Sequence, residues 1–466
     1  MKKQKLFGTS GIRGIVNKSI FPSTFLKVGL AFADFLGNEG VIIVGRDNRF
    51  SSISYKMAFI SGVTAGGVDV IDVDLAPTPA VLHAIKEMIA DGGAVITGSH
   101  TPKDINGIMF FKEDTSELTK EEEEELEDIF NGEKHNLQEW DSFGQVISEE
   151  EPIEEIYANS IEEKFNFSKF TISEIIIDSG NGAMSNVMGN ILENFGFHVI
   201  RINDYGTGDF PFRDPYPREE TLTVLSRLSA KLEMVGIGVD GDGDRAIFTD
   251  ELGRIIPGDI IGTIFAVEEL KKKKIGDIVV PINTSLITQR LVEKYNGRIH
   301  YTKVGPPNIV KKMIDTNAIF GFEETGKYIW PENIYYGDAL YSALKLLELL
   351  SNRETKLLEL VNKLPQFYQK KIALPCPDKI KETVLSEIRD IWTQISHEKN
   401  MSFEIIDMDG IKFVYPELDT WILFRPSGTE PQFRVYIESK DKKLLEDLVQ
   451  CAIEKTKKVI EKYKIG

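Results

Sequence analysis

Three aspartates at alternate positions form the most distinctive pattern in the sequence. Asp240, Asp242 and Asp244 are separated by glycines in the segment DGDGDR. Because glycine lets the backbone turn freely, all three carboxylates can face one cation. Oxygen ligands favour Mg²⁺, Mn²⁺ or Ca²⁺ over softer metals. We therefore expect this loop to bind a hard divalent cation.

Three other interpretations of the acidic loop stay open at this point. An EF-hand would need glycine at its sixth position, where Arg245 stands, and helices on both sides, whereas VGIGV and AIFTD look like strands. The segment GIGVDG matches the GxGxxG pattern of dinucleotide-binding proteins, although the carboxylates around it would repel a pyrophosphate. The third alternative is an acidic turn that faces solvent and binds nothing.

A serine follows the end of the expected strand 94–97. Ser99 lies between Gly98 and His100 in the segment TGSHTP. A serine in such a place can act as a nucleophile or carry a phosphoryl group, although an ordinary loop serine is the common alternative. The sequence lacks the GxSxG motif of hydrolases, so a hydrolase triad is not indicated.

Arginine and hydroxyl side chains surround a glycine near the C-terminus. The segment RPSGTEP contains Arg425, Ser427, Gly428 and Thr429, and Arg434 follows it. Such a group of donors suits a phosphate dianion. A plain hairpin turn is the alternative.

Two more loops combine glycine with charged side chains. In FEETGK, Glu323 can accept hydrogen bonds from sugar hydroxyls, with Thr325 and Lys327 beside it; an exposed acidic turn is the alternative. In FGTSGIRG, Arg13 is the single cation of a glycine-rich segment that can wrap into a site, with a flexible terminus as the alternative.

Strands and helices alternate along most of the chain, which predicts βαβ units and a parallel type of sheet. The run Glu121–Glu125 predicts a solvated helix face. The last hundred residues have a different order of elements, with several strand-like runs between two helices, which predicts a separate α+β module. Expected strands are 41–44, 68–74, 94–97, 175–177, 199–202, 235–239, 278–282 and 318–322, and expected helices are 51–65, 79–88, 118–130, 259–270, 286–295 and 337–350.

Composition excludes several classes of protein. The chain has 466 residues, and 55 Lys and Arg against 73 Asp and Glu give a net charge of −18. That charge argues against binding to nucleic acid, which needs cations at the phosphates. No apolar run reaches the roughly 18 residues of a membrane span, and the N-terminus lacks the apolar segment of a secretory signal. Cys376 and Cys451 are too few for a disulfide framework, so we expect a cytoplasmic protein.

In combination and in this order, the five loops resemble those of the α-D-phosphohexomutase family. FGTSGIRG is similar to its N-terminal motif, TGSHTP to its phosphoserine loop, DGDGDR to its metal loop, FEETGK to its sugar loop and RPSGTEPQFR to its phosphate-binding loop. The resemblance covers essentially the whole chain and is closest in wording to the archaeal branch. The chain departs from the pattern at Thr101, where Asn is usual, at Met109, where many members have Lys, and at Lys327, where His or Gly is frequent.

The resemblance implies an α/β fold of four domains around a central cleft. Three related α/β domains would span residues 1–150, 151–254 and 255–366, and a C-terminal α+β domain with a TATA-binding-protein-like fold would span residues 367–466.

The resemblance also implies that the chain interconverts hexose 6-phosphates and hexose 1-phosphates of glucosamine, mannose or glucose. A phosphoserine at Ser99 would give its phosphoryl group to the sugar, and the bound 1,6-bisphosphate would return its other phosphate. The implied cofactors are one Mg²⁺ and a hexose 1,6-bisphosphate activator. The archaeal wording favours glucosamine.

Specific residues take roles under the same resemblance. Because Met109 cannot transfer a proton, His100 or Lys112 is the expected substitute for the usual lysine. The implied catalytic residues are Ser99, His100, Arg13 and Arg245; the implied Mg²⁺ ligands are phosphorylated Ser99, Asp240, Asp242 and Asp244; the implied substrate contacts are Glu323, Thr325, Lys327, Arg425, Ser427, Gly428, Thr429 and Arg434.

Two other functions are weighed against a mutase. One is a sugar-phosphate-binding paralogue with impaired turnover, which Met109 suggests. The other is a phosphatase-like enzyme, against which the second phosphate site at Arg425 argues. A phosphosugar is the expected partner, without nucleic acid or membrane, and the protein is expected to be a monomer or a homodimer.

Overall fold

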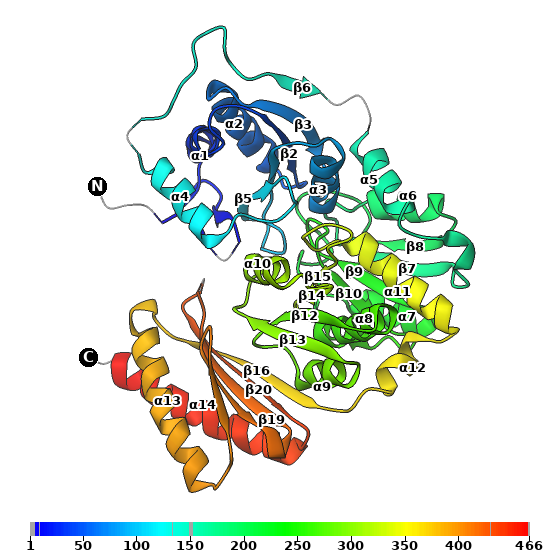
Figure 1. The fold of residues 1–466 in the computed structure, drawn as a ribbon, viewed down its shortest axis with the longest axis vertical. Coiled ribbons are helices and arrows are strands. Elements are labelled where there is room, and N and C mark those ends of the chain that lie inside the picture. Colours follow the sequence, from blue (N-terminus) through cyan, green and yellow to red (C-terminus); the bar gives the residue numbers. More distant parts are fainter. Residues whose placement is uncertain (1–4, 9, 133, 149–151, 429, 465–466) are drawn as a thin grey trace.

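The computed structural model describes residues 5–8, 10–132, 134–148, 152–428 and 430–464. Its strands form four sheets, each built from one stretch of the chain (Figure 1). One apolar cluster contains residues of the first three sheets, and the fourth sheet has a separate cluster with its own helices. None of the described helices is long and apolar enough to cross a membrane.

The first sheet has six strands in the order β1-β5-β4-β2-β3-β6. Strands β4, β2, β3 and β6 are parallel, but β5 is antiparallel to β4 and β1 is antiparallel to β5. The expectation of a parallel sheet is therefore only partly right. The elements are β1 (Ile12–Ile15), α1 (Pro22–Phe35), β2 (Val41–Arg46), α2 (Ser52–Ala65), β3 (Asp69–Leu75), α3 (Thr78–Glu87), β4 (Gly92–Ile96), β5 (Ile105–Lys112), α4 (Lys120–Phe130) and β6 (Val146–Ser148).

The pleat of this sheet decides which helices its side chains meet. Ile42 and Val44 of β2 belong to the apolar cluster of α1 and α2, whereas Ile43 belongs to the cluster of α3. Strand β5 divides in the same way, because successive side chains point to opposite faces. Met109 consequently lies on the α3 face, together with Phe111.

The acidic run on α4 is not solvated along its whole length. Glu123 is only 3% exposed, whereas Glu121, Glu124 and Glu125 are exposed. Burial raises the pKa of Glu123 to about 7 although Lys120 donates a hydrogen bond to it. The expectation of a fully solvated helix face is thus wrong at this one residue.

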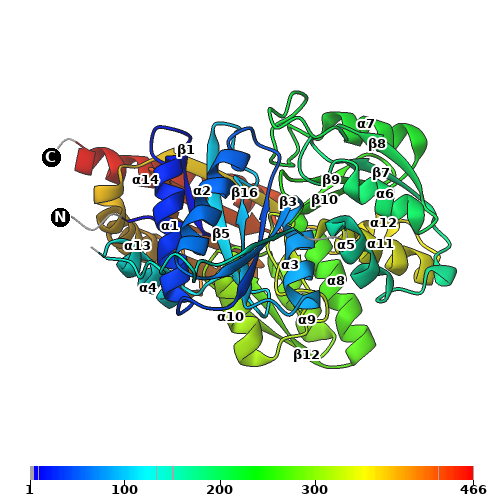
Figure 2. The same cartoon turned by 90° about the horizontal axis from the view of Figure 1, so that it is seen from above.

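The second sheet has the order β11-β10-β9-β7-β8, in which β8, β7 and β9 are parallel and β10 and β11 are antiparallel additions. Helix α3 of the first sheet packs against α5, which precedes the second sheet (Figure 2). The elements are α5 (Ile153–Glu162), η1 (Phe167–Lys169), β7 (Glu174–Asp178), α6 (Val187–Asn194), β8 (His198–Ile202), α7 (Thr223–Leu232), β9 (Gly236–Val239), β10 (Ala246–Thr249) and β11 (Ile255–Ile256).

The third sheet has the order β13-β12-β14-β15, with parallel pairing except for β15. Its long helix α11 is buried along most of its length. The elements are α8 (Gly258–Lys273), β12 (Gly276–Pro281), α9 (Leu286–Lys294), β13 (Gly297–Thr302), α10 (Pro306–Thr316), β14 (Phe320–Phe322), β15 (Tyr328–Ile329), α11 (Ala339–Arg353) and α12 (Leu357–Asn362).

The fourth sheet is antiparallel throughout, in the order β16-β20-β19-β18-β17. Ile422 and Phe424 of β19 face the helices α13 and α14, whereas Trp421 and Leu423 pack with Ile282 and Leu286 of the third sheet's region. This confirms the expected C-terminal α+β module. The elements are β16 (Tyr368–Pro375), η2 (Asp378–Ile380), α13 (Lys381–Glu398), β17 (Glu404–Asp407), β18 (Ile411–Tyr415), η3 (Pro416–Leu418), β19 (Thr420–Pro426), β20 (Gln432–Ser439) and α14 (Lys442–Lys464).

Candidate active site

The acidic loop is the turn of the hairpin formed by β9 and β10. Asp240, Asp242 and Asp244 are buried, and each offers a carboxylate oxygen within 4.8 Å of the other two. Antiparallel strands on both sides exclude an EF-hand, which needs helices, and a dinucleotide fingerprint, which opens a helix. Burial of the three side chains excludes an acidic turn that simply faces solvent.

The electrostatics of the three aspartates fit a bound cation. Burial and the neighbouring carboxylates raise the pKa of Asp240 well above its usual value and that of Asp242 to about 6. Asp244 differs, because Lys327 and Arg245 outweigh the effect of burial and lower its pKa. Among the described residues, Asp242 Oδ1 has no hydrogen-bond partner although it is buried. A hard divalent cation would satisfy that oxygen and offset the like charges.

Ser99 lies directly beside this group of carboxylates. Its Oγ is 3.2 Å from Asp240 Oδ2, and the residue is 1% exposed. Its backbone has φ 49°, a left-handed conformation that is uncommon outside glycine, asparagine and aspartate. The Ser99 amide donates to Thr97 Oγ1 at 2.7 Å, which helps to hold this conformation. The structure therefore brings the predicted phosphoserine and the predicted metal ligands together.

His100 is adjacent to the Ser99 hydroxyl. Its Nδ1 lies 3.2 Å from Ser99 Oγ. Burial lowers the pKa of His100 well below its usual value, and the nearby Arg245, Arg13 and Lys327 lower it further. The ring is therefore neutral at physiological pH and has one nitrogen that can accept a proton.

Sequence reasoning missed the pair that supports the serine loop. Arg49, which is 1% exposed, donates to Ser99 O at 2.9 Å and to Thr101 O at 2.6 Å, and also pairs with Asp47. Asp47 accepts from Gly98 N at 3.1 Å. The signal was present in the segment GRDNR, because its last three residues follow the buried strand β2, which lies beside β4 in the same sheet.

Thr78, at the first turn of α3, was also missed. Its Oγ1 donates to Asp242 Oδ2 at 2.9 Å, and its amide donates to Asp242 O at 2.9 Å. Thr97 Oγ1 also lies 3.3 Å from Asp242 Oδ2. These hydroxyls fix the orientation of the carboxylate. No local pattern marks Thr78, because its partner is 164 residues away.

Arg13 and Met109 meet at one side of the site. Strand β1 pairs with β5, and Arg13 Nη2 lies 3.8 Å from the Met109 sulfur. The hydroxyls of Ser10 and Tyr336 lie 3.6 and 3.5 Å from the same sulfur. Ser10 also donates to the buried Glu117 at 2.6 Å. Met109 therefore occupies a buried position between the N-terminal segment and the third sheet's region.

Arg245 and Lys327 place two cations on the acidic loop. Arg245 Nε lies 3.8 Å from Asp240 Oδ2 and 3.5 Å from Asp244 Oδ1. Lys327 Nζ lies 3.0 Å from Asp244 Oδ2 and 3.8 Å from the centre of the Tyr336 ring. Lys327 is 2% exposed, so the structure places this predicted substrate contact on a metal-loop carboxylate.

The sugar loop lies between β14 and β15. Glu323 is buried and accepts a hydrogen bond from Gly305 N at 3.1 Å. Thr325 Oγ1 donates to Glu323 Oε2 at 3.3 Å. These hydrogen bonds orient the Glu323 carboxylate, as is needed for a residue that binds specific hydroxyl groups of a sugar.

The predicted phosphate-binding loop connects β19 and β20. Arg425, the penultimate residue of β19, pairs with Asp409 at 2.8 Å, and Arg434 on β20 pairs with Glu430. Thr429 lies outside the described residues. Lys381, a further residue that sequence reasoning missed, donates to Ser427 O at 2.5 Å and to Glu430 O at 2.6 Å and so shapes the backbone of the loop around Gly428.

The five loops fall into two connected groups. Ser99, Asp240, Asp244 and Lys327 form one chain of direct contacts, with Arg13 and Arg245 beside it. The phosphate-binding loop is joined to the sugar loop through intermediate residues, because Arg425 pairs with Asp409, Asp409 accepts from Val304 N, and the next amide, Gly305 N, donates to Glu323. Within the described part of the chain, no hydrogen bond or ion pair joins it to the Ser99 loop. In Figure 1 the β19–β20 end of the fourth sheet points toward α10 and the middle of the molecule.

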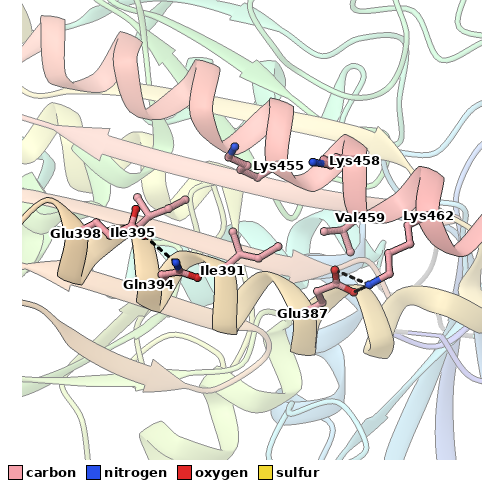
Figure 3. A pocket seen from close by; sticks show the side chains of 9 residues that line it. All are labelled: Glu387, Ile391, Gln394, Ile395, Glu398, Lys455, Lys458, Val459 and Lys462. Carbon is pink, nitrogen blue, oxygen red and sulfur yellow. Dashed lines mark hydrogen bonds and ion pairs between the residues drawn. The ribbon is translucent and has the colours of Figure 1, made fainter.

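A cavity of about 500 Å³ lies elsewhere, between α13 and α14 (Figure 3). Its floor is apolar, and Glu387 and Lys462 pair across it at 2.8 Å. It contains none of the predicted site residues. Its lining residues are Glu387, Ile391, Gln394, Ile395, Glu398, Lys455, Lys458, Val459 and Lys462.

Comparison with known proteins agrees with the geometry of the site. Four family models match in succession, described as phosphoglucomutase/phosphomannomutase α/β/α domains I, II and III and the C-terminal domain. They cover residues 4–137, 155–253, 257–368 and 372–455.

Two archaeal relatives match almost from end to end. A phosphoglucomutase/phosphomannomutase of Thermococcus kodakarensis is 34% identical over 96% of this chain and 98% of its own length. A phosphoglucosamine/phosphogalactosamine mutase of Sulfurisphaera tokodaii is 35% identical over 98% of this chain and 99% of its own length.

Solved structures share the fold. A phosphoglucomutase/phosphomannomutase family protein of Burkholderia thailandensis has a TM-score of 0.85 at 23% identity and covers 97% of each chain. An N-acetylphosphoglucosamine mutase of Aspergillus fumigatus, solved with GlcNAc-6P and magnesium, has a TM-score of 0.64 at 13% identity and covers 98% of this chain and 96% of its own. The chain therefore belongs to the phosphoglucomutase/phosphomannomutase family.

Proposed function

We propose that this protein is a phosphosugar mutase that interconverts hexose 6-phosphates and hexose 1-phosphates through a phosphoserine at Ser99. The observation that carries the proposal is the position of Ser99 Oγ, 3.2 Å from Asp240 in a buried group of three aspartates. Membership of the family supports the same reaction class.

Phosphorylated Ser99 supplies the phosphoryl group. The bond between Ser99 Oγ and phosphorus breaks, and a bond forms between phosphorus and a hydroxyl oxygen of the hexose monophosphate. The hydroxyl proton passes to the neutral ring of His100. Because His100 Nδ1 lies 3.2 Å from Ser99 Oγ, the ring then returns a proton to the serine oxygen, which leaves as a hydroxyl group. The product is a hexose 1,6-bisphosphate. The bound intermediate then reverses its orientation in the site, and its other phosphoryl group is transferred to Ser99 by the reverse reaction.

The cations of the site stabilise the charge that develops during transfer. Two of these cations are the side chains of Arg245 and Arg13, and the third is one Mg²⁺. The proposed ligands of Mg²⁺ are Asp240, Asp242, Asp244 and the Ser99 phosphate. When bound, Mg²⁺ would act as a Lewis acid toward the transferring group. The magnesium in the Aspergillus enzyme supports this assignment.

The second phosphate needs its own binding site because the intermediate carries two. We assign it to Arg425, Ser427, Gly428, Thr429 and Arg434. Glu323 and Thr325, with Lys327 beside them, would contact the sugar hydroxyls. Glu323 is linked to Arg425 through Gly305, Val304 and Asp409, which supports this division of the substrate between two loops.

The remaining parts of the proposal concern substrate and setting. The names of the relatives include glucosamine, galactosamine, mannose and glucose phosphates, and we propose glucosamine 6-phosphate as the preferred substrate. A hexose 1,6-bisphosphate would act as activator. We further propose a cytoplasmic monomer or homodimer with domain bounds at 1–150, 151–254, 255–366 and 367–466.

The decisive experiment supplies the purified protein with glucosamine 6-phosphate, mannose 6-phosphate or glucose 1-phosphate, together with Mg²⁺ and a trace of hexose 1,6-bisphosphate. Isomerised sugar phosphate is the expected product. Ser99→Ala should lower the turnover rate at least about a thousandfold, because the residue that carries the phosphoryl group is lost. Ser168→Ala, at an exposed position of the short helix η1, serves as the matched control.

The other outcomes of this experiment contradict the proposal in distinct ways. Release of inorganic phosphate would identify a phosphatase-like enzyme. Tight binding of a sugar phosphate without turnover would identify a binding paralogue with impaired catalysis. Full activity of Ser99→Ala would exclude the phosphoserine.

A further inference from the structure

The turn between β17 and β18 places a carboxylate on the arginine of the phosphate-binding loop. Asp409 lies in this turn, next to Gly410, whose φ is 116°. A side chain on Gly410 would meet Phe424 O at 2.4 Å and Arg425 Cα at 3.0 Å. Only glycine therefore lets the turn approach β19 closely enough for Asp409 to reach Arg425.

The contact with Asp409 uses Nε of Arg425 and leaves the two terminal nitrogens of the guanidinium available for a phosphate. Arg425 Nε donates to Asp409 Oδ2 at 2.8 Å. Within the described part of the chain, the two terminal nitrogens of Arg425 donate to no protein group. The guanidinium is a rigid planar fork, so fixing Nε also fixes the direction of the terminal N–H groups that a phosphate would use. The Arg425 side chain is 9% exposed and that of Asp409 21%, so solvent screens the pair only in part.

Asp409 also connects the fourth sheet to the sugar loop. The same Oδ2 accepts a hydrogen bond from Val304 N at 3.0 Å, and the next amide, Gly305 N, donates to Glu323 at 3.1 Å. Two consecutive amides of the segment between β13 and α10 therefore bind two carboxylates. One carboxylate holds the phosphate-binding arginine and the other belongs to the sugar loop.

We propose that Asp409 is a positioning residue, which orients Arg425 for a phosphate group and sets its distance from the sugar loop. The proposal rests on the proposed function, in which Arg425 and Glu323 bind two parts of one substrate. Loss of the carboxylate would free the guanidinium to rotate and would release the fourth sheet from Val304. Phosphate binding then weakens, while the groups around Ser99 stay unchanged.

Asp409→Asn tests the proposal with little disturbance of the backbone, because asparagine tolerates the left-handed conformation of this turn (φ 50° at Asp409). Asp407→Asn is the matched control. Asp407 stands on the same hairpin and pairs with Arg389 at 2.7 Å, and its side chain is 59% exposed.

The first measurement is titration calorimetry with inorganic phosphate, which needs neither sugar nor turnover. We expect Asp409→Asn to bind phosphate about tenfold more weakly than the wild type and Asp407→Asn to bind it equally well. On an Arg425→Lys background, Asp409→Asn should cause a much smaller loss than in the wild type, because most of its effect on phosphate passes through Arg425. Equal affinity of Asp409→Asn and the wild type, or additive losses in the double variant, would overturn the proposal, as would failure of the wild type to bind phosphate.

The second measurement separates this proposal from the mutase assignment. With sugar phosphates, Asp409→Asn should raise KM about tenfold and change kcat much less, since binding of the idle phosphate is common to ground and transition states. A fall in kcat with unchanged KM would contradict the positioning role. If the wild type binds phosphate but isomerises no sugar phosphate, the proposed function fails, and the calorimetric comparison still decides whether Asp409 positions Arg425.

Discussion

At the scale of single residues, the site concentrates charges that the fold by itself would not favour. Three buried aspartates within 4.8 Å of one another repel each other, and Lys327 and Arg245 compensate them only in part. Ser99 adds backbone strain on the order of 1–3 kcal/mol, which its supports at Thr97 and Arg49 must offset. Such costs are typical of functional sites.

The first prediction concerns this repulsion. Asp242→Asn should stabilise the metal-free protein by about 1 kcal/mol, because it removes one of the like charges. The same change should abolish the stabilisation by Mg²⁺, which for the wild type is about 2.7 kcal/mol at a metal concentration a hundredfold above the dissociation constant. Thermal unfolding with EDTA and with Mg²⁺ measures both effects.

Asp214→Asn is the control for Asp242→Asn, since the Asp214 side chain is 65% exposed and pairs with Arg218 at 3.2 Å. It should leave both melting temperatures within the error of the wild type. A Mg²⁺-dependent shift that survives in Asp242→Asn would show that the three aspartates do not hold the metal.

At the scale of elements, the site forms where strand ends and one helix start converge. The loops after β2 and β4 meet because the two strands are parallel neighbours, so Asp47 and Arg49 can support Ser99. The hairpin of β9 and β10 belongs to the second sheet, and its turn contacts the first turn of α3, where Thr78 donates a hydrogen bond to Asp242.

The second prediction tests the role of α3. Thr78→Val keeps the shape of the side chain but removes the hydroxyl that donates to Asp242 at 2.9 Å. We expect affinity for Mg²⁺ to fall by about tenfold, because supporting hydrogen bonds orient metal ligands. Thr78→Ser should restore the affinity, and calorimetry with Mg²⁺ or Mn²⁺ measures it. Equal affinity of Thr78→Val and the wild type would show that Thr97 alone orients Asp242.

At the scale of the whole molecule, a buried polar cluster joins three parts of the chain. His83 of α3 lies 3.3 Å from Asp338, the N-cap residue of α11, and 2.7 Å from Ser160 of α5. Tyr157 donates to Asp338 at 2.6 Å. The amide of the next residue, Ala339, donates to Gly243 O of the acidic loop at 3.1 Å. The cluster therefore connects the packing of the first three sheets to the acidic loop.

The third prediction is a pH dependence of stability. Burial lowers the pKa of His83, against the opposing effect of Asp338, so the folded protein holds this ring neutral. The unfolded chain takes up the proton below a pH of about 6.5, and stability therefore falls as the pH drops through that value, by at most about 1.4 kcal/mol per pH unit. Asp338, whose pKa is lowered by His83 and Tyr157 despite burial, loses its contribution only in a more acidic range.

Urea unfolding between pH 7.5 and pH 5 measures this effect. The slope of unfolding free energy against pH should be smaller in His83→Gln than in the wild type. His198→Gln is the matched control, because the His198 side chain is 72% exposed. Equal slopes in His83→Gln and the wild type would show that folding does not lower the pKa of His83.

The sequence by itself determined much of the fold and the identity of the five loops. Apolar runs bounded by glycine and polar residues predicted β2, β4, β7 and β9 because a buried strand needs an apolar run of that length. The acidic loop could be recognised because its residues are consecutive. Strands β1 and β5 carry a weaker local pattern, and their antiparallel pairing depends on contacts across some ninety residues.

Only the tertiary structure decided which side chains meet. Thr78 and Asp242, His83 and Asp338, and Asp409 and Val304 are each more than a hundred residues apart, and no pattern within either partner's neighbourhood marks the contact. Lys327 likewise reaches Asp244 because β15 packs beside the hairpin of β9 and β10. Local sequence controls the conformation of a short segment, whereas the packing of sheets and helices against one another controls distances between segments, and the chemistry of this site depends on those distances.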